Sequence, residues 1–491
     1  MRLSDLSDTT ADAVRSAGAF VTDLMTPSIR LGVTGFARSG KTVFITALVR
    51  NLIAGGRLPF FAAMAQGRIR RAYLEPQPDD EIPRFAYEEH LSQLAKDPPQ
   101  WPLSTRRISQ LRVSIEYTSA SPLRRLVGAG RLHLDIVDYP GEWLIDLALL
   151  EQTVAGWSRR AIAAAEAGHR GEAARTWLAY AGSLSGERPA DELTAQRGAE
   201  LFSAYLEEAR RADPSRLGLG PGRFLWPGDL AGSPLLTFFP LSCRTERGHK
   251  RGTLAAMLAR RFESYKALVV QPFFREHFAR LDRQIVLIDA LSALNGGAQA
   301  LKDLADALDA ILKSFRPGPN TWLGSLLGSR RIDRVLFAAT KADHLHHTNH
   351  DRLEALLRLL VDQAVARTSL AGAQVQVLAL AALRATREAE AKSGADRLPC
   401  ILGVPLPGER LGQKLFDGRS ETALFPGDLP EAGAIVRTEP ANLKVAKLDP
   451  VSFLNFRPPR LALASAAGEA SAWPHIRLDR SIDYLIGDQL A

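Results

Sequence analysis

The sequence predicts an α/β fold with a mostly parallel sheet, interrupted by a large all-helical segment. Three observations lead to it. Apolar strands end in polar motifs at 35–42, 138–141 and 340–343, and a helical pattern follows the first of them. Between residues 143 and 282 the strand patterns vanish and alanine-rich helical runs replace them. At 491 residues the chain also exceeds the size that one core usually supports, so more than one domain is expected.

The first motif, GFARSGKT at 35–42, matches the Walker A phosphate loop G-x-x-x-x-G-K-[ST], between a predicted strand and a predicted helix. Its glycines allow backbone N–H groups to face a β-phosphate, and the helix N-terminus adds partial positive charge. We expect Lys41 to reach the β- and γ-phosphates and the Thr42 hydroxyl to bind Mg²⁺. The residues expected to bind the nucleotide here are Gly35, Arg38, Ser39, Gly40, Lys41, Thr42 and Val43. Arg38 could act on the phosphates or face solvent, and a chance glycine-rich turn is the alternative for the whole motif.

The second motif, Asp138-Tyr139-Pro140-Gly141, closes an apolar strand and matches D-x-x-G. In nucleotide switches such an aspartate holds Mg²⁺ through water, and the glycine N–H senses the γ-phosphate. Thr105, on a long loop, is the candidate for the switch threonine that would contact Mg²⁺; otherwise it is an ordinary loop residue. Glu142 stands where a water-positioning glutamine is usual. It could orient water, but an ionised carboxylate would be repelled by the phosphates.

The third motif, Thr340-Lys341-Ala342-Asp343, follows another strand and matches [NT]-K-x-D. A carboxylate at Asp343 can accept two parallel hydrogen bonds from guanine N1–H and the 2-amino group, a donor pair that adenine lacks. Lys341 would lay its aliphatic stem over the base, and Thr340 replaces the commoner asparagine. After the next strand, Ala381 and Ala382 could offer a backbone N–H to guanine O6. The alternative is a strand followed by a polar turn.

The chain order predicts four parts. These are an N-terminal helix at 1–27, a discontinuous nucleotide domain at 28–142 and 283–395, a helical insertion at 143–282, and a C-terminal extension at 396–491 packing on the nucleotide domain. Within them, residues 384–392 are predicted to be helical, and so are residues 477–490.

Composition restricts the class of protein. Two cysteines far apart exclude a disulfide framework, and no Cys/His cluster has metal-ligand spacing. A net charge of +8 is compatible with acidic partners but selects none, and no specific nucleic-acid motif is evident. The N-terminus does not resemble a signal peptide, and no run of apolar residues is long enough to cross a membrane. We therefore expect a cytoplasmic protein, which could be peripheral at the inner membrane.

These motifs resemble the YcjX-like family of bacterial P-loop proteins. The resemblance also rests on segments outside the nucleotide motifs, at 101–105, 142–144, 224–230, 272–274 and 474–479. It implies a Ras-like nucleotide domain that binds GTP or GDP with Mg²⁺. It also suggests a stress-related bacterial role near the cell envelope.

Three functions remain open from the sequence. The first is a GTP-dependent switch with slow hydrolysis, acting on an unknown protein effector that could be membrane-associated. The second is an ATPase that couples hydrolysis to remodelling of a partner. The third is a scaffold that binds nucleotide only for stability. Lys341 and Asp343 favour guanine over adenine.

Overall fold

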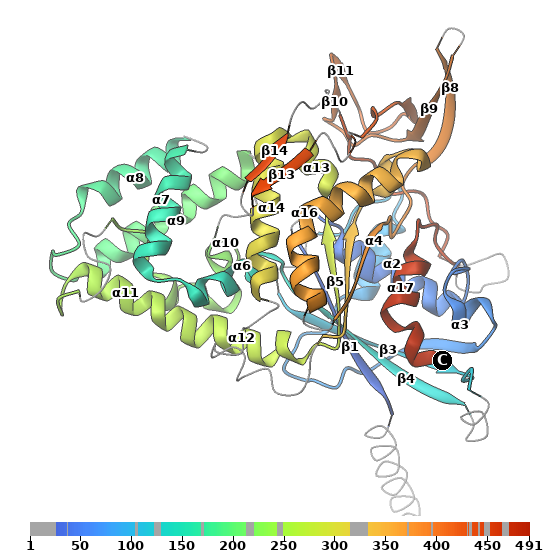
Figure 1. Ribbon diagram of the computed structural model, residues 1–491, viewed down its shortest axis with the longest axis horizontal. Helices are drawn as coiled ribbons and strands as arrows, with labels where there is room; N and C mark the ends of the chain where they lie inside the picture. The colour runs from blue at the N-terminus through green and yellow to red at the C-terminus, as the bar shows by residue number, and fades with distance from the viewer. Residues whose placement is uncertain are drawn as a thin grey trace, which may run out of the picture.

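The computed structural model has a seven-stranded sheet at its centre, with helices packed on both faces (Figure 1). The structure describes residues 26–36, 38–103, 107–121, 129–167, 171–212, 220–242, 249–314, 332–370, 373–393, 396–429, 431, 435–439, 442–445, 452–463 and 471–491. Residues 1–25, which hold most of the predicted N-terminal helix, lie outside this set.

The sheet is mostly parallel, as predicted. Its strands in spatial order are β2 (Ile69–Glu75), β3 (Ser109–Tyr117), β4 (Gly130–Asp138), β1 (Ser28–Gly35), β5 (Arg283–Ile288), β6 (Arg334–Ala339) and β7 (Gln374–Ala379). Only β3 runs against its neighbours, while β4, β1, β5, β6 and β7 pair in parallel. The predicted α/β fold is therefore confirmed. The phosphate-loop strand β1 lies in the middle, between β4 and β5, so the first two motifs leave the same edge of the sheet side by side.

Side chains of the central strands alternate between two cores, because successive residues of a strand point to opposite faces. Leu287 of β5 joins the core that includes Leu48 of α2 (Lys41–Ala54) and Ile482 of α17 (Leu478–Ile486). Its neighbours in β5 join the other core, with α14 (Gly297–Ser314) and α16 (His350–Leu370). The shorter helices near these faces are α3 (Ala62–Ala65), α4 (Tyr87–Leu94) and α13 (Ala290–Asn295).

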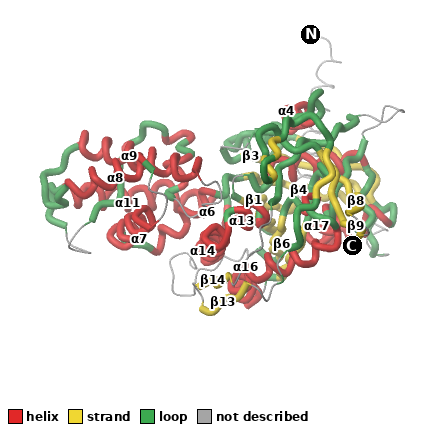
Figure 2. The backbone as a smooth tube through the Cα atoms, turned by 90° about the horizontal axis from the view of Figure 1, so that it is seen from above, coloured by secondary structure: helices red, strands yellow, loops and turns green. Residues whose placement is uncertain are grey.

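The elements that the structure describes between β4 and β5 are helical. They are α6 (Glu142–Leu147), α7 (Val154–Ala167), α8 (Glu172–Ser183), α9 (Glu192–Ala212), α10 (Gly222–Leu225), α11 (Leu254–Tyr265) and α12 (Gln271–Glu276), with 3₁₀ turns at Ala148–Glu151, Gly228–Leu230, Pro234–Leu236 and Phe278–Arg280 and a π-helical turn at Lys266–Val270. Helices α7, α8, α9 and α11 form a lobe beside the sheet domain (Figure 2).

Aromatic side chains fill the lobe and connect it to the sheet. Trp157 stacks on Phe262 with ring centroids 5.2 Å apart, and Trp177 stacks on Tyr205 at 5.1 Å. Tyr139, in the D-x-x-G motif, meets the ring of Phe273 edge-on at 5.9 Å. One continuous hydrophobic core therefore runs from the motif into the lobe.

The prediction of a helix over 384–392 is wrong. Residues Arg387–Ser393 form strand β8, which pairs antiparallel with β9 (Asp396–Gly403), and β9 pairs with β12 (Thr422–Leu424). Alanine, glutamate and lysine favour helices, but pairing with β9 overrides that weak local preference. Two further hairpins are β10 (Arg410–Leu411) with β11 (Lys414–Leu415), and β13 (Ile435–Glu439) with β14 (Asn442–Val445).

The C-terminal segment returns to the sheet domain. Helix α17 packs into the α2 core, and a 3₁₀ turn follows at Gly487–Leu490. The buried guanidinium of Arg283, at the start of β5, donates to the Leu485 carbonyl at 3.0 Å and to the Asp488 carboxylate at 2.9 Å. Among the described residues, none of the helices combines the length and the apolar character needed to span a bilayer.

Candidate functional site

The phosphate loop connects β1 to α2, and its backbone adopts left-handed conformations that favour glycine. Gly40, the residue before α2, has a φ of 87°, and Arg38 has a φ of 64°. No side chain caps the N-terminus of α2, where the first backbone N–H groups of a helix have no acceptor within the helix. A helix N-terminus in this condition attracts anions. The local geometry thus suits a phosphate group.

Lys41 lies over this loop and is almost fully buried. Its ammonium group donates to the carbonyl oxygen of Gly35 and, at 3.4 Å, to that of Phe36. The carbonyl oxygens of Gly35 and Phe36 therefore hold the Lys41 ammonium group at the phosphate loop, where the Walker A motif requires a positive charge. The hydroxyl oxygen of Ser39 is also buried in the loop.

The D-x-x-G turn packs directly against the phosphate loop. Asp138, the last residue of β4, is only 1% exposed and lies opposite Val33 of β1 in the parallel register. A Cβ atom added to Gly141 would come within 2.2 Å of the Gly35 carbonyl oxygen. Only glycine therefore allows this approach of the two backbones.

The donors at this junction fit a magnesium ion. Thr42 offers a hydroxyl oxygen and Asp138 a carboxylate, which are the oxygen ligands that Mg²⁺ prefers. Both residues are buried at the edge of the sheet where β1 and β4 end. Thr105 and the side chain of Glu142 lie outside the described residues.

The T-K-A-D segment follows β6 at the same edge of the sheet. Lys341 has a φ of 61°, and its ammonium group forms an ion pair of 2.6 Å with Asp289, which directly follows β5. It also donates to the Asn455 side chain at 3.2 Å. Thr340 is buried, and its backbone N–H donates to the Ile288 carbonyl at 2.9 Å. These contacts fix the segment between β5 and the C-terminal part of the chain.

Asp343 is 4% exposed, and one of its carboxylate oxygens accepts the backbone N–H of Ala385 at 2.8 Å. Burial raises the pKa of Asp343 to about 6, against the lowering effect of the Ala385 hydrogen bond. The carboxylate is therefore held in place by the backbone and is ionised at neutral pH.

The loop after β7 lies beside this aspartate, since the Ala342 N–H donates to the Leu380 carbonyl at 3.1 Å. Ala381 exchanges two backbone hydrogen bonds with Ile476, donating at 3.0 Å and accepting at 2.8 Å. Its N–H is thus already used within the protein. Of the two alanines predicted to offer an N–H to a base, Ala382 is the better candidate.

A cavity of about 500 Å³ brings the first and third motifs together. The described residues that line it include all the predicted nucleotide-binding residues except Gly35, the last residue of β1. They are Arg38, Ser39, Gly40, Lys41, Thr42, Val43, Thr340, Lys341, Asp343, Ala381 and Ala382. Asp138 and Gly141 are not among the lining residues; Gly141 packs on Gly35, and Asp138 lies opposite Val33 of β1.

Sequence reasoning missed the residues that close this cavity. One wall comes from the C-terminal part of the chain, where Pro407, Glu409, Asn455 and Phe456 line it. Trp101 lies on the same side and donates its indole N–H to the Phe456 carbonyl at 2.7 Å. Trp101 and Phe456 are 355 positions apart in the sequence, and no spacing in the sequence indicates that they are in contact.

Comparison with known proteins places the chain in a family. The YcjX-like family, DUF463, matches residues 29–490. The chain is 38% identical over 481 residues to the protein named Ras-like GTPase YcjX of Escherichia coli (strain K12), covering 94% of this chain and 96% of that protein. It is 33% identical over 483 residues to the protein of the same name from Shewanella oneidensis, covering 94% of each. The chain therefore belongs to the YcjX-like family.

Proposed function

We propose that the protein binds GTP and GDP with Mg²⁺ and hydrolyses GTP slowly as a nucleotide-dependent switch. The observation that carries the proposal is the cavity shared by the phosphate loop and the T-K-A-D segment. Its volume of about 500 Å³ falls within the range of small-molecule sites. The names of the two relatives, Ras-like GTPase YcjX, support the same conclusion.

In this proposal each part of the site has one role. The N–H groups at the start of α2 and the ammonium of Lys41 hold the β- and γ-phosphates. Asp343 accepts guanine N1–H and the 2-amino group, and Ala382 donates to O6. Thr42 and Asp138 would hold Mg²⁺, which supplies charge neutralisation between the phosphates when bound. Thr105 is proposed to contact Mg²⁺, and Glu142 is proposed to position the attacking water.

Two features support a switch rather than a site that only stores nucleotide. Helix α6 begins directly after Gly141, so the helical lobe is connected to the γ-phosphate sensor. Within α6, Asp146 is buried and accepts the Tyr265 hydroxyl at 2.6 Å and the Gly222 N–H at 2.7 Å. A shift of the turn at Gly141 would therefore move contacts deep in the lobe.

The base preference gives the direct test. We expect calorimetry to find GDP bound at least about 100-fold more tightly than ADP, because a site built to accept two donors rejects a base that lacks them. The Lys41→Ala variant should lose both nucleotides, since the phosphates contribute to either complex. If ADP binds as tightly as GDP, the guanine assignment is wrong.

Binding of GDP should also depend on pH in a defined direction. Only the ionised carboxylate of Asp343 accepts both guanine donors, and burial raises the pKa of Asp343 to about 6. The contribution of Asp343 to the affinity should therefore be constant above pH 7 and fall by up to about tenfold per unit below pH 6. The phosphate groups of GDP titrate in the complexes of both proteins. The ratio of the GDP affinity of the unchanged protein to that of Asp343→Asn therefore reports the titration of the Asp343 carboxyl group alone. A ratio that does not change with pH would contradict the role of Asp343.

A role in envelope stress remains a separate proposal, which the family resemblance suggests. It requires an effector that distinguishes the GTP-bound from the GDP-bound protein. A deletion strain that withstands envelope stress as its parent does would contradict this part without affecting nucleotide binding.

A further inference from the structure

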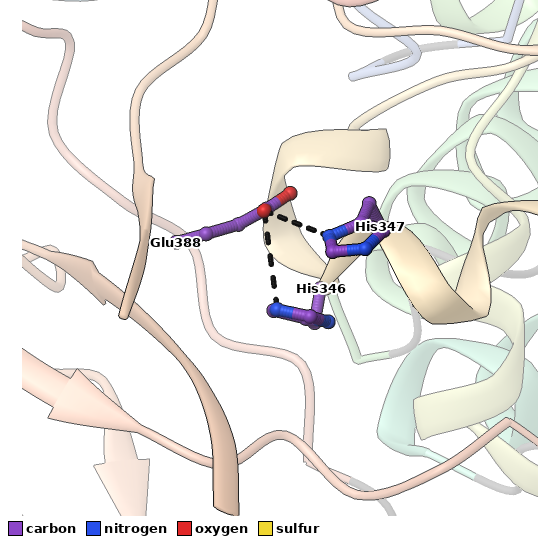
Figure 3. Close-up of side chains that lie close together, drawn as sticks. All are labelled: His346, His347 and Glu388. Carbon is purple, nitrogen blue, oxygen red and sulfur yellow. Dashed lines mark hydrogen bonds and ion pairs between the residues drawn. The ribbon is translucent and has the colours of Figure 1, made fainter. Parts of the chain in front are cut away.

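A cluster of two histidines and a glutamate lies outside the nucleotide cavity (Figure 3). His346 and His347 follow the T-K-A-D segment, and Glu388 lies on β8. In Figure 3 the imidazole rings and the carboxylate point toward one another from these two segments. One ligand atom from each residue lies within 4.8 Å of the other two.

The distances suit a single transition-metal ion. His347 Nδ1 lies 2.8 Å from Glu388 Oε2, and His346 Nε2 lies 3.9 Å from the same oxygen. Zinc binds histidine nitrogen and carboxylate oxygen at about 2.0–2.2 Å, which places the donors of a tetrahedral site about 3.4 Å apart. The two distances lie on either side of that value, and all three ligand atoms lie within 4.8 Å of one another, so small side-chain rotations would complete the site.

Neighbouring groups orient these ligands. The other ring nitrogen of His346, Nδ1, lies 3.0 Å from the Thr348 hydroxyl. The other oxygen of Glu388, Oε1, faces Arg384 at 3.8 Å, which leaves Oε2 for the histidines. Metal-binding histidines are usually oriented by such a second contact. The side chain of His346 is 14% exposed and that of His347 is 63% exposed, so water can reach the cluster as a fourth ligand.

The same two segments also hold Asp343. Ala385, three residues before Glu388, donates its N–H to the Asp343 carboxylate, and the Thr386 hydroxyl donates to the Asp343 carbonyl. His346 lies three residues after Asp343 in the chain. A metal ion bound by the cluster would connect the two segments a second time, outside the cavity.

We propose that His346, His347 and Glu388 bind a zinc ion, with water as the fourth ligand. The donor set of two imidazoles and one carboxylate selects Zn²⁺ over Mg²⁺, which prefers oxygen ligands alone. The site is distinct from the one suggested for magnesium by Thr42 and Asp138, and it does not depend on the nucleotide that the protein binds. Sequence spacing could not reveal it, because His347 and Glu388 are 41 residues apart.

The test is a titration of the chelator-treated full-length protein, without nucleotide, with ZnCl₂ in a calorimeter. We expect one Zn²⁺ per chain with micromolar or tighter affinity, undiminished by a large excess of Mg²⁺, and a rise in Tm on zinc binding. Loss of a group that merely supports a metal ligand weakens binding about 10–100-fold, so His347→Ala and Glu388→Gln should each weaken it at least about tenfold.

His249→Gln provides the matched control, because it removes an imidazole from the helical lobe and leaves the cluster intact. It should bind zinc as the unchanged protein does, and circular dichroism should show all three variants folded. Tetrahedral Co²⁺ gives visible absorption bands that report the geometry directly, and these should vanish in Glu388→Gln. Equal zinc affinity in all variants, or no stoichiometric binding, would overturn the proposal. A variant that fails to fold would leave the Mg²⁺ competition and the Co²⁺ spectrum of the unchanged protein to decide it.

Discussion

Replacing Asp343 with asparagine is expected to lower GDP affinity at least about 100-fold and to create binding of xanthosine diphosphate. The Ala385 N–H, 2.8 Å from the carboxylate, requires an acceptor, so the amide oxygen should take that position. The amide NH₂ then faces a guanine donor. One charge-assisted hydrogen bond is lost and two donors oppose each other, which costs about 3 kcal/mol or more. Xanthine carries a carbonyl in place of the 2-amino group and so accepts from the amide.

The measurement is calorimetry with GDP and xanthosine diphosphate on both proteins. Asp417→Asn, at an exposed turn of the C-terminal part, makes the same chemical change away from the cavity and should alter neither affinity. An unchanged GDP affinity in Asp343→Asn would mean that this carboxylate does not read the base. Loss of both nucleotides with a lowered Tm would mean instead that the Ala385 contact is needed for folding, and Asp343→Glu would then separate the two effects by keeping the charge.

The sequence could predict the framework of this site because its motifs lie at strand ends. Parallel strands bring their carboxyl ends to one edge of a sheet, so motifs at 35–42, 138–141 and 340–343 should meet there. The phosphate loop and the T-K-A-D segment do share one cavity, and Gly141 packs on Gly35. The residue types within each motif were sufficient for this prediction, because each motif lies within a few residues of the end of its own strand.

What the sequence could not show depends on contacts between distant segments. Asn455 donates to Glu409, and both line the cavity, yet neither belongs to a recognisable motif. The pairing of β8 with β9 converts a segment of good helix formers into a strand, and only that tertiary pairing places Glu388 beside His347. Asp289 is a similar case. It directly follows β5, but its ion pair with Lys341 requires β5 and β6 to be neighbours.

Replacing Gly141 with alanine should reduce GTP hydrolysis at least about 100-fold, which is the usual cost of losing one backbone donor to transition-state charge. The added Cβ would lie 2.2 Å from the Gly35 carbonyl oxygen and 3.0 Å from the Phe36 nitrogen. Both are backbone atoms of a loop fixed between β1 and α2, so the D-x-x-G turn must move away. Its N–H then no longer reaches the γ-phosphate. GDP has no such phosphate, and its affinity should stay within about threefold, below 1 kcal/mol.

The consequence for the lobe distinguishes a switch from a simple hydrolase. Because α6 begins directly after Gly141 and Asp146 is bonded to Tyr265, hydrogen exchange across 142–151 should differ between GDP and a non-hydrolysable GTP analogue. Gly141→Ala should abolish that difference. Gly182→Ala, in α8 with open space around its Cα, is the matched control and should preserve both hydrolysis and the exchange difference. If Gly141→Ala hydrolyses GTP normally, the turn has a structural role only, and the lobe must respond to nucleotide through another contact or not at all.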